Sequence, residues 1–123
     1  MKKAALVLAV AASLWAGSAS AMTVQEFLTS ANRIPRNPTA LLRSDTRRLM
    51  NEINGAFKTV GDEQKAAQAA NRRAATCIPD GAKISLSPDM ILTRFNAIPA
   101  ARRNISVTQA VREWMAAEHP CPA

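Results

Sequence analysis

Apolar residues recur at helical spacing over most of the chain after residue 22. The clearest stripe has apolar positions seven, four, three and four residues apart and consists of Leu42, Leu49, Ile53, Ala56 and Val60. This spacing places the side chains on one face of an α-helix. Leu41, Met50 and Phe57 widen the face. We expect the helix to end at Gly61, because glycine readily adopts the left-handed conformation that follows a helix.

Three further helices are predicted from the residues that precede them. Thr23 and Glu26 have capping-box spacing, as do Ser106 and Gln109, and Ser87-Pro88 supplies an N-cap serine and a proline at the first helical position. Their apolar faces hold Val24, Phe27, Leu28 and Ala31, then Met90, Ile91 and Phe95, then Val107, Val111, Trp114 and Met115. No alternating pattern of useful length predicts a strand. We therefore expect an all-α fold, a small bundle of four or five helices.

The segment from Asp62 to about Ala75 is harder to assign. Asp62 is a good cap for a further helix, and the segment is rich in alanine. Its residues are small or polar on nearly every face. The pattern leaves two interpretations open, a partly exposed helix or a mobile arm.

The first 21 residues have the composition of a secretory signal. Lys2 and Lys3 are followed by an apolar stretch from residue 4 to residue 15, and Ala19-Ser20-Ala21 offers small residues for cleavage. The apolar stretch is shorter than the ~20 residues that a membrane-spanning helix needs. We expect residues 1–21 to be a signal peptide and residues 22–123 to be a single periplasmic domain without a membrane span.

The chain has two cysteines, Cys77 and Cys121, and we expect them to form an intramolecular disulfide. Disulfides persist in exported proteins. The chain-entropy model gives a stabilisation of ~4 kcal/mol for a loop of this length. A domain of this size buries about two thirds of the surface of its unfolded chain, so its stability is modest and a crosslink helps.

The chain is basic, with a formal net charge of +7. Its arginines occur in dispersed pairs, at residues 47–48, 72–73 and 102–103. The chain has three phenylalanines, two tryptophans and no tyrosine, which is few stacking side chains for a nucleic-acid-binding protein. We interpret the pairs mainly as solvated helix surface. Attraction to an acidic partner or to anionic lipid is the functional alternative.

We predict no catalytic, metal or cofactor site. His119 is the only histidine and lies beside Cys121, but a Cys–His nucleophile pair requires a free thiolate. A metal site requires three or four converging ligands, which one histidine and two oxidised cysteines do not supply. The chain has neither a glycine-rich phosphate loop nor a haem-attachment motif. The sequence therefore indicates a protein that is not an enzyme.

The C-terminal half resembles the Rap/Tai family of immunity proteins, which protect bacteria from peptidoglycan amidases delivered by type VI secretion. The resemblance rests on Cys77-Ile78-Pro79-x-Gly81, on Pro99 and Arg102 after a helix, and on a last helix that ends in Pro120-Cys121. It extends from Leu42 onward. The segment before Cys77 is richer in alanine, glutamine and arginine than the family pattern.

The resemblance implies an all-helical homodimer in the periplasm that binds a peptidoglycan amidase and blocks its active-site cleft. The segment that matches the family's blocking loop is residues 77–87, with Asp80, Lys83 and Ser85 as candidate partner-binding residues. The alternative for Pro79-Asp80-Gly81 is a tight turn without a binding role. Two other functions stay open: an Hde-like periplasmic stress chaperone, or another non-catalytic envelope-binding protein.

Overall fold

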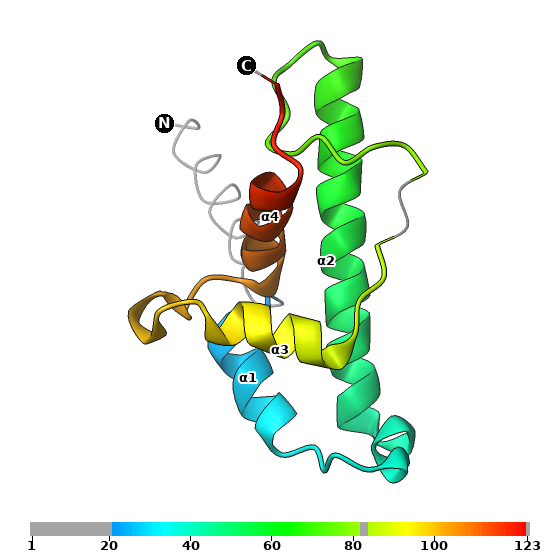
Figure 1. Cartoon of the computed structure of the whole chain (residues 1–123), viewed down its shortest axis with the longest axis vertical. Coiled ribbons are helices and arrows are strands. Elements are labelled where there is room, and N and C mark those ends of the chain that lie inside the picture. Colours follow the sequence, from blue (N-terminus) through cyan, green and yellow to red (C-terminus); the bar gives the residue numbers. More distant parts are fainter. Residues whose placement is uncertain (1–20, 82–83, 123) are drawn as a thin grey trace, which may run out of the picture.

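The computed structural model describes residues 21–81 and 84–122 (Figure 1). This part of the chain contains four α-helices, two short 3-10 helices and no β-strand. The predicted small all-α bundle is confirmed. No helix within these residues is both long enough and apolar enough to cross a membrane. The predicted signal peptide lies outside the described residues, apart from its last residue.

Helix α2 (Ser44–Ala69) is a single continuous helix of 26 residues, so the prediction that it ends at Gly61 is wrong. The stripe continues past Gly61 with Gln64 and Ala67, both of which are buried. Packing of these two residues compensates for the helix-weakening effect of an internal glycine. The predicted separate helix from Asp62 does not form, because residues 62–69 are the end of α2.

Asn71 terminates α2 in the manner that was expected of Gly61. Its φ angle is 53°, in the left-handed region. The amide of Asn71 donates to the carbonyl of Gln68 at 3.2 Å, and the amide of Arg72 donates to the carbonyl of Ala67 at 2.8 Å. These two bonds form a Schellman motif, which satisfies two carbonyls at the end of the helix. Residues 72–79 then run in a non-helical conformation.

The core lies where α4 (Val107–Glu118) packs against α2 (Figure 1). The rings of Phe57 and Trp114 meet edge to face there, with centroids 5.8 Å apart. Helices α1 (Val24–Asn32) and α3 (Pro88–Asn96) close the other end of the core. Phe27 of α1 and Phe95 of α3 meet in the same way at 5.1 Å. The inward faces predicted for α1 and α4 are thus confirmed.

Three residues of the predicted apolar stripe are on the surface instead. Leu41 is 69% exposed, Leu42 is 81% exposed and Met50 is 53% exposed. Leu41 and Leu42 belong to a short 3-10 helix, η1 (Pro38–Leu42), which precedes α2. Pro38 starts η1 and α2 begins only at Ser44, so the two leucines are out of register with the buried face of α2.

Three of the four predicted N-cap residues accept the expected hydrogen bond, whereas Asp62 lies inside α2 and caps no helix. The hydroxyl oxygens of Thr23, Ser87 and Ser106 accept from the third helical amide at 3.0–3.2 Å. The side chain of Gln109 contacts Glu113 rather than completing a box with Ser106. The chain before α1 also pairs with the chain before α4 through one antiparallel bridge between Thr23 and Ser106. This pairing fixes the start of the domain against the start of α4.

Candidate partner-binding loop

The disulfide ties the C-terminal tail to the start of the candidate loop. Cys77 and Cys121 are bonded, with their Cα atoms 4.9 Å apart and a sequence separation of 44. The amide of Cys77 also donates to the carbonyl of His119 at 2.9 Å. Both the covalent and the backbone contact hold the segment at residue 77 against the end of α4. The predicted disulfide is confirmed.

Gln64 of α2 provides the second anchor and was missed by the sequence analysis. Its side chain is only 8% exposed. Its Nε2 donates to the carbonyl of Ile78 at 2.9 Å, and its Oε1 accepts from the amide of Ile78 at 2.8 Å. The same Oε1 accepts from the buried hydroxyl of Thr76 at 3.0 Å. Gln64 lies four residues after Val60 and therefore on the same helix face as the apolar stripe. This spacing was the signal in the sequence that Gln64 is buried.

The loop turns sharply directly after this anchored base. Asp80 and Gly81 form a turn, and the φ angle of Gly81 is 75°, which favours glycine. The predicted tight turn is therefore present. Asp80 is exposed at the turn and Ser85 is exposed further along the loop. Lys83 lies outside the described residues, so the structure does not place it relative to the other two.

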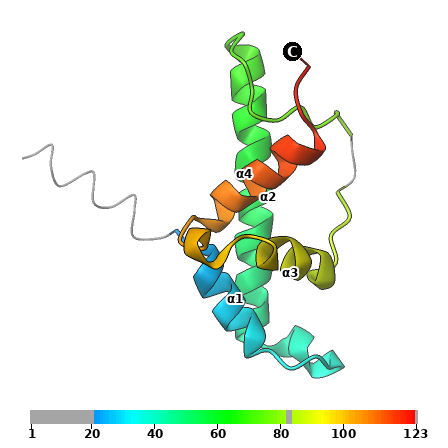
Figure 2. The same cartoon turned by 60° about the vertical axis from the view of Figure 1, so that its left-hand side comes forward.

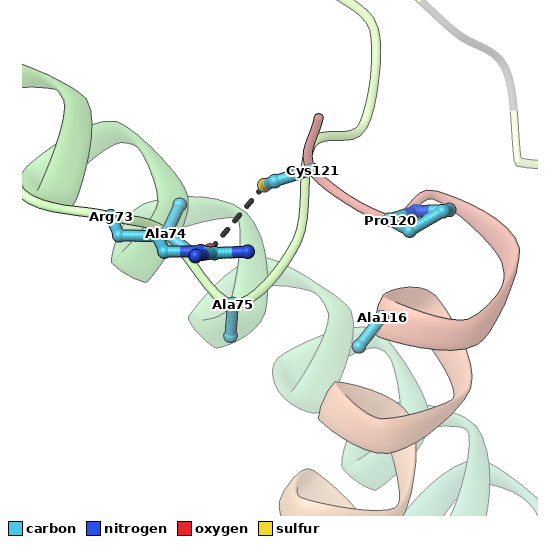
Figure 3. Close-up of a pocket in the computed structure, with 6 residues that line it drawn as sticks. All are labelled: Arg73, Ala74, Ala75, Ala116, Pro120 and Cys121. Atoms are coloured by element: carbon cyan, nitrogen blue, oxygen red, sulfur yellow. Dashed lines mark hydrogen bonds between the residues drawn. The ribbon is translucent and has the colours of Figure 1, made fainter. Parts of the chain in front are cut away.

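A surface pocket of about 470 Å³ lies beside the disulfide (Figure 3). It is lined by Arg73, Ala74, Ala75, Ala116, Pro120 and Cys121. The Sγ atom of Cys121 lies 3.3 Å from the carbonyl oxygen of Ala74. Because the sulfur of a disulfide carries no proton, this is a close contact and not a hydrogen bond. The lining consists of small apolar groups and one guanidinium, that of Arg73.

Arg102 and Arg103 both make side-chain contacts within the molecule. Arg102 pairs with Glu113 of α4 at 3.1 Å. Arg103 donates through Nε to the carbonyl of Ile98 at 3.0 Å and through a terminal nitrogen to the carbonyl of Asn96 at 3.1 Å. The pairs were interpreted mainly as solvated helix surface, and Arg103 differs from this in satisfying carbonyls at and just after the end of α3.

The single histidine has a structural position at the end of α4. His119 is the C-cap of α4, and its amide donates to the carbonyl of Met115 at 2.7 Å. Within residues 21–81 and 84–122, no group of three or more metal-binding side chains comes together. The chemistry that the loop region does offer is recognition through exposed polar groups on a fixed backbone.

Comparison with models of protein families, with curated proteins and with solved structures finds no match. The resemblance to the Rap/Tai family therefore rests on the cysteine, proline and glycine residues that carry it.

Proposed function

We propose that the protein is a non-catalytic periplasmic immunity protein that binds and inhibits a peptidoglycan amidase effector of type VI secretion. The observation that carries the proposal is the double anchoring of an exposed turn. The Cys77–Cys121 disulfide and the hydrogen bonds of Gln64 both hold the base of the loop. In this proposal the signal peptide directs the chain to the periplasm and is removed there.

A turn fixed in advance is well suited to enter an active-site cleft. Binding a loose loop costs the entropy of ordering it, whereas a loop held at its base loses less. The turn at Asp80 and Gly81 is exposed and follows immediately after the anchored residues 76–78. Asp80 offers a carboxylate and Ser85 a hydroxyl to polar groups in the cleft. Lys83 belongs to the proposed contact by its position in the sequence.

The proposal includes a homodimer, as the resemblance implies. The molar mass of the exported, oxidised protein in light scattering should be twice that of one chain. The same measurement with the amidase added gives the stoichiometry of the complex.

The test of the proposal is binding to, and inhibition of, a peptidoglycan amidase effector, which the proposal predicts to be encoded beside this gene. The oxidised protein should bind the amidase with a 1:1 ratio of chains and should stop its release of peptides from purified peptidoglycan. Ser85→Arg should weaken binding at least tenfold, because it places a large charged side chain in the contact. Asn54→Arg is the matched control: it makes the same charge change on the exposed side of α2 and should bind like the wild type.

Two results would contradict the proposal at different levels. Absence of both binding and inhibition by the wild-type protein would remove the immunity function itself. Inhibition that is unchanged in both Ser85→Arg and Asp80→Arg would keep the immunity function but remove the loop from the contact.

A second candidate function, an acid-activated chaperone of the Hde-like kind, is favoured by one observation. Arg112 of α4 pairs with Glu63 of α2 at 2.8 Å, so a carboxylate helps to hold the two main helices together. Loss of this ion pair would favour exposure of the core. The discriminating experiment is aggregation of an unfolded client protein at low pH, which a chaperone suppresses and an immunity protein does not.

A further inference from the structure

The short helix η1 exposes two adjacent leucines at one end of the molecule. Leu41 is 69% exposed and Leu42 is 81% exposed, and no residue of η1 is buried. The helix η1 packs mainly against the start of α2, and both views show it projecting at the lower end of the fold (Figures 1 and 2). Exposed leucines on a projecting turn cost solvation free energy unless another surface covers them.

Arginines flank this turn on both sides in sequence. The segment from residue 33 to residue 48 contains one acidic residue, Asp45, and five basic residues, which are Arg33, Arg36, Arg43, Arg47 and Arg48. We refer to Leu41, Leu42 and these five arginines as the basic tip. The tip combines an apolar centre with a strong positive charge, a combination found on surfaces that bind anionic membranes.

Much of this charge is available to a partner. Arg43 pairs with Asp45 at 2.8 Å, and Arg36 lies 3.8 Å from Asp89 with both side chains highly exposed. Among the described residues, no carboxylate forms an ion pair with Arg33 or Arg47. The tip therefore keeps a net positive charge after its internal pairs are counted.

The charge and the shape of the tip favour binding to a lipid bilayer over binding to a second copy of the chain or to another protein. A second copy of the chain would bring two sets of arginines together, and like charges repel at an interface. A stable protein–protein contact buries about 800 Å² on each partner, which two leucines on a convex turn do not provide. A bilayer can deform around a convex tip, and its phosphate groups match the guanidinium groups.

We propose that the basic tip docks the protein on anionic phospholipid membranes. Leu41 and Leu42 enter the boundary between headgroups and acyl chains, and the surrounding arginines contact lipid phosphates. The end of α2 and the C-terminal tail, which carries Cys121 of the disulfide, lie at the other end of the molecule (Figures 1 and 2). Docking would thus direct the disulfide end away from the membrane. The inference does not depend on an amidase partner.

The experiment is co-sedimentation of the exported, oxidised protein (residues 22–123) with vesicles. Vesicles of phosphatidylglycerol and phosphatidylcholine should bind the protein, vesicles of phosphatidylcholine alone should not, and added salt should weaken binding. The variant L41S/L42S should lose at least about tenfold in affinity, because the apolar contact is removed. R33Q/R47Q should lose roughly 25-fold, at about fivefold for each arginine near an anionic surface.

R72Q/R73Q is the matched control, because it removes two exposed arginines after the opposite end of α2. It should bind vesicles almost like the wild type. Loss of binding equal to that of R33Q/R47Q would show a general charge effect and overturn the proposal. Unchanged vesicle binding by L41S/L42S would also overturn it, because the apolar centre of the tip would then take no part in docking. Absence of wild-type binding to the anionic vesicles would overturn it directly. Circular dichroism of each variant verifies the fold.

Discussion

The side chain of Gln64 pairs with the backbone of Ile78 in both directions. Its Nε2 donates to the Ile78 carbonyl at 2.9 Å and its Oε1 accepts from the Ile78 amide at 2.8 Å. A neighbouring β-strand would offer the same donor and acceptor, but here a side chain from a helix supplies them. Backbone groups next to the core are satisfied in this way without a sheet. The contact fixes the loop one residue after the disulfide.

We expect Gln64→Ala to lower the free energy of unfolding by about 2–4 kcal/mol, because it leaves the backbone of Ile78 and the hydroxyl of Thr76 without their partner. Thr76→Val removes only one hydrogen bond and should cost about 1 kcal/mol. Urea unfolding followed by circular dichroism measures both values. Equal losses in the two variants would mean that the bonds to Ile78 contribute little.

We expect the double variant Cys77→Ser/Cys121→Ser to be less stable than the oxidised protein by up to ~4 kcal/mol. The physical reason is the larger conformational freedom of the unfolded chain once the crosslink over 44 positions is removed. Thermal melts with and without reductant provide the measurement. Reductant should lower the Tm of the wild type and leave that of the double variant unchanged. A wild-type Tm that is insensitive to complete reduction would contradict this prediction.

Local signals in the sequence were sufficient for the parts of the fold that depend on neighbouring residues. The N-caps at Thr23, Ser87 and Ser106 were predictable because a hydroxyl needs only the amide three residues ahead. The inward face of α4 followed from its spacing. The disulfide followed from the cysteine count and the expected export.

The errors arose where distant contacts decide the outcome. Gly61 is a common helix terminator, but burial of Gln64 and Ala67 against other parts of the chain extends α2 beyond it. Leu42 has the right spacing for the buried face, yet the chain direction set by Pro38 places it on the surface. The role of Gln64 depends on Ile78, which lies 14 residues away. No local pattern contains that information.

The interior position of Gly61 and Gly55 in α2 predicts that alanine at either site will stabilise the protein. A Cβ atom added at either glycine meets no atom within 4 Å. Alanine loses less conformational entropy in a helix, so each substitution should add about 0.5–1 kcal/mol to the free energy of unfolding. Gly81→Ala is the contrasting variant, because its φ of 75° is unfavourable for alanine, and it should destabilise. Stabilisation by Gly81→Ala would contradict the turn geometry.

Arg103 is expected to matter for stability rather than for partner attraction. Its guanidinium donates to the carbonyls of Asn96 and Ile98 at the end of α3. Arg103→Ala should therefore cost about 1–2 kcal/mol, since two hydrogen bonds from a charged donor are lost and one of them is partly buried. Arg102→Ala breaks only an exposed ion pair with Glu113 and should cost less than about 1 kcal/mol. Urea unfolding of the two variants measures both losses of unfolding free energy. A larger loss for Arg102→Ala than for Arg103→Ala would contradict the prediction that Arg103 is the more important of the two for stability.

Three carboxyl groups have lowered pKa values in the folded protein, and we therefore expect the stability to fall in acid. A hydrogen bond from Arg43 lowers the pKa of Asp45 from 3.8 to about 2, and a hydrogen bond from Lys58 lowers the pKa of Asp62. A hydrogen bond from Gln109 and, to a smaller extent, one from Arg102 lower the pKa of Glu113. A carboxyl whose pKa is lower in the folded state binds fewer protons there than in the unfolded chain. Its contribution is therefore complete above the unfolded pKa and is lost as the pH falls through the folded pKa.

For Asp45 this loss should occur between about pH 4 and pH 2. We expect the Tm to be nearly constant from neutral pH down to about pH 5 and to decline below it. The double variant Asp45→Asn/Glu113→Gln should have a lower Tm at neutral pH and a smaller decline, because two of the titrating contacts are already absent. Arg43→Gln should flatten the curve as Asp45→Asn does, and combining the two should add little, since both remove the same pair. An equally steep decline in the double carboxyl variant would contradict this prediction and assign the acid sensitivity to other groups.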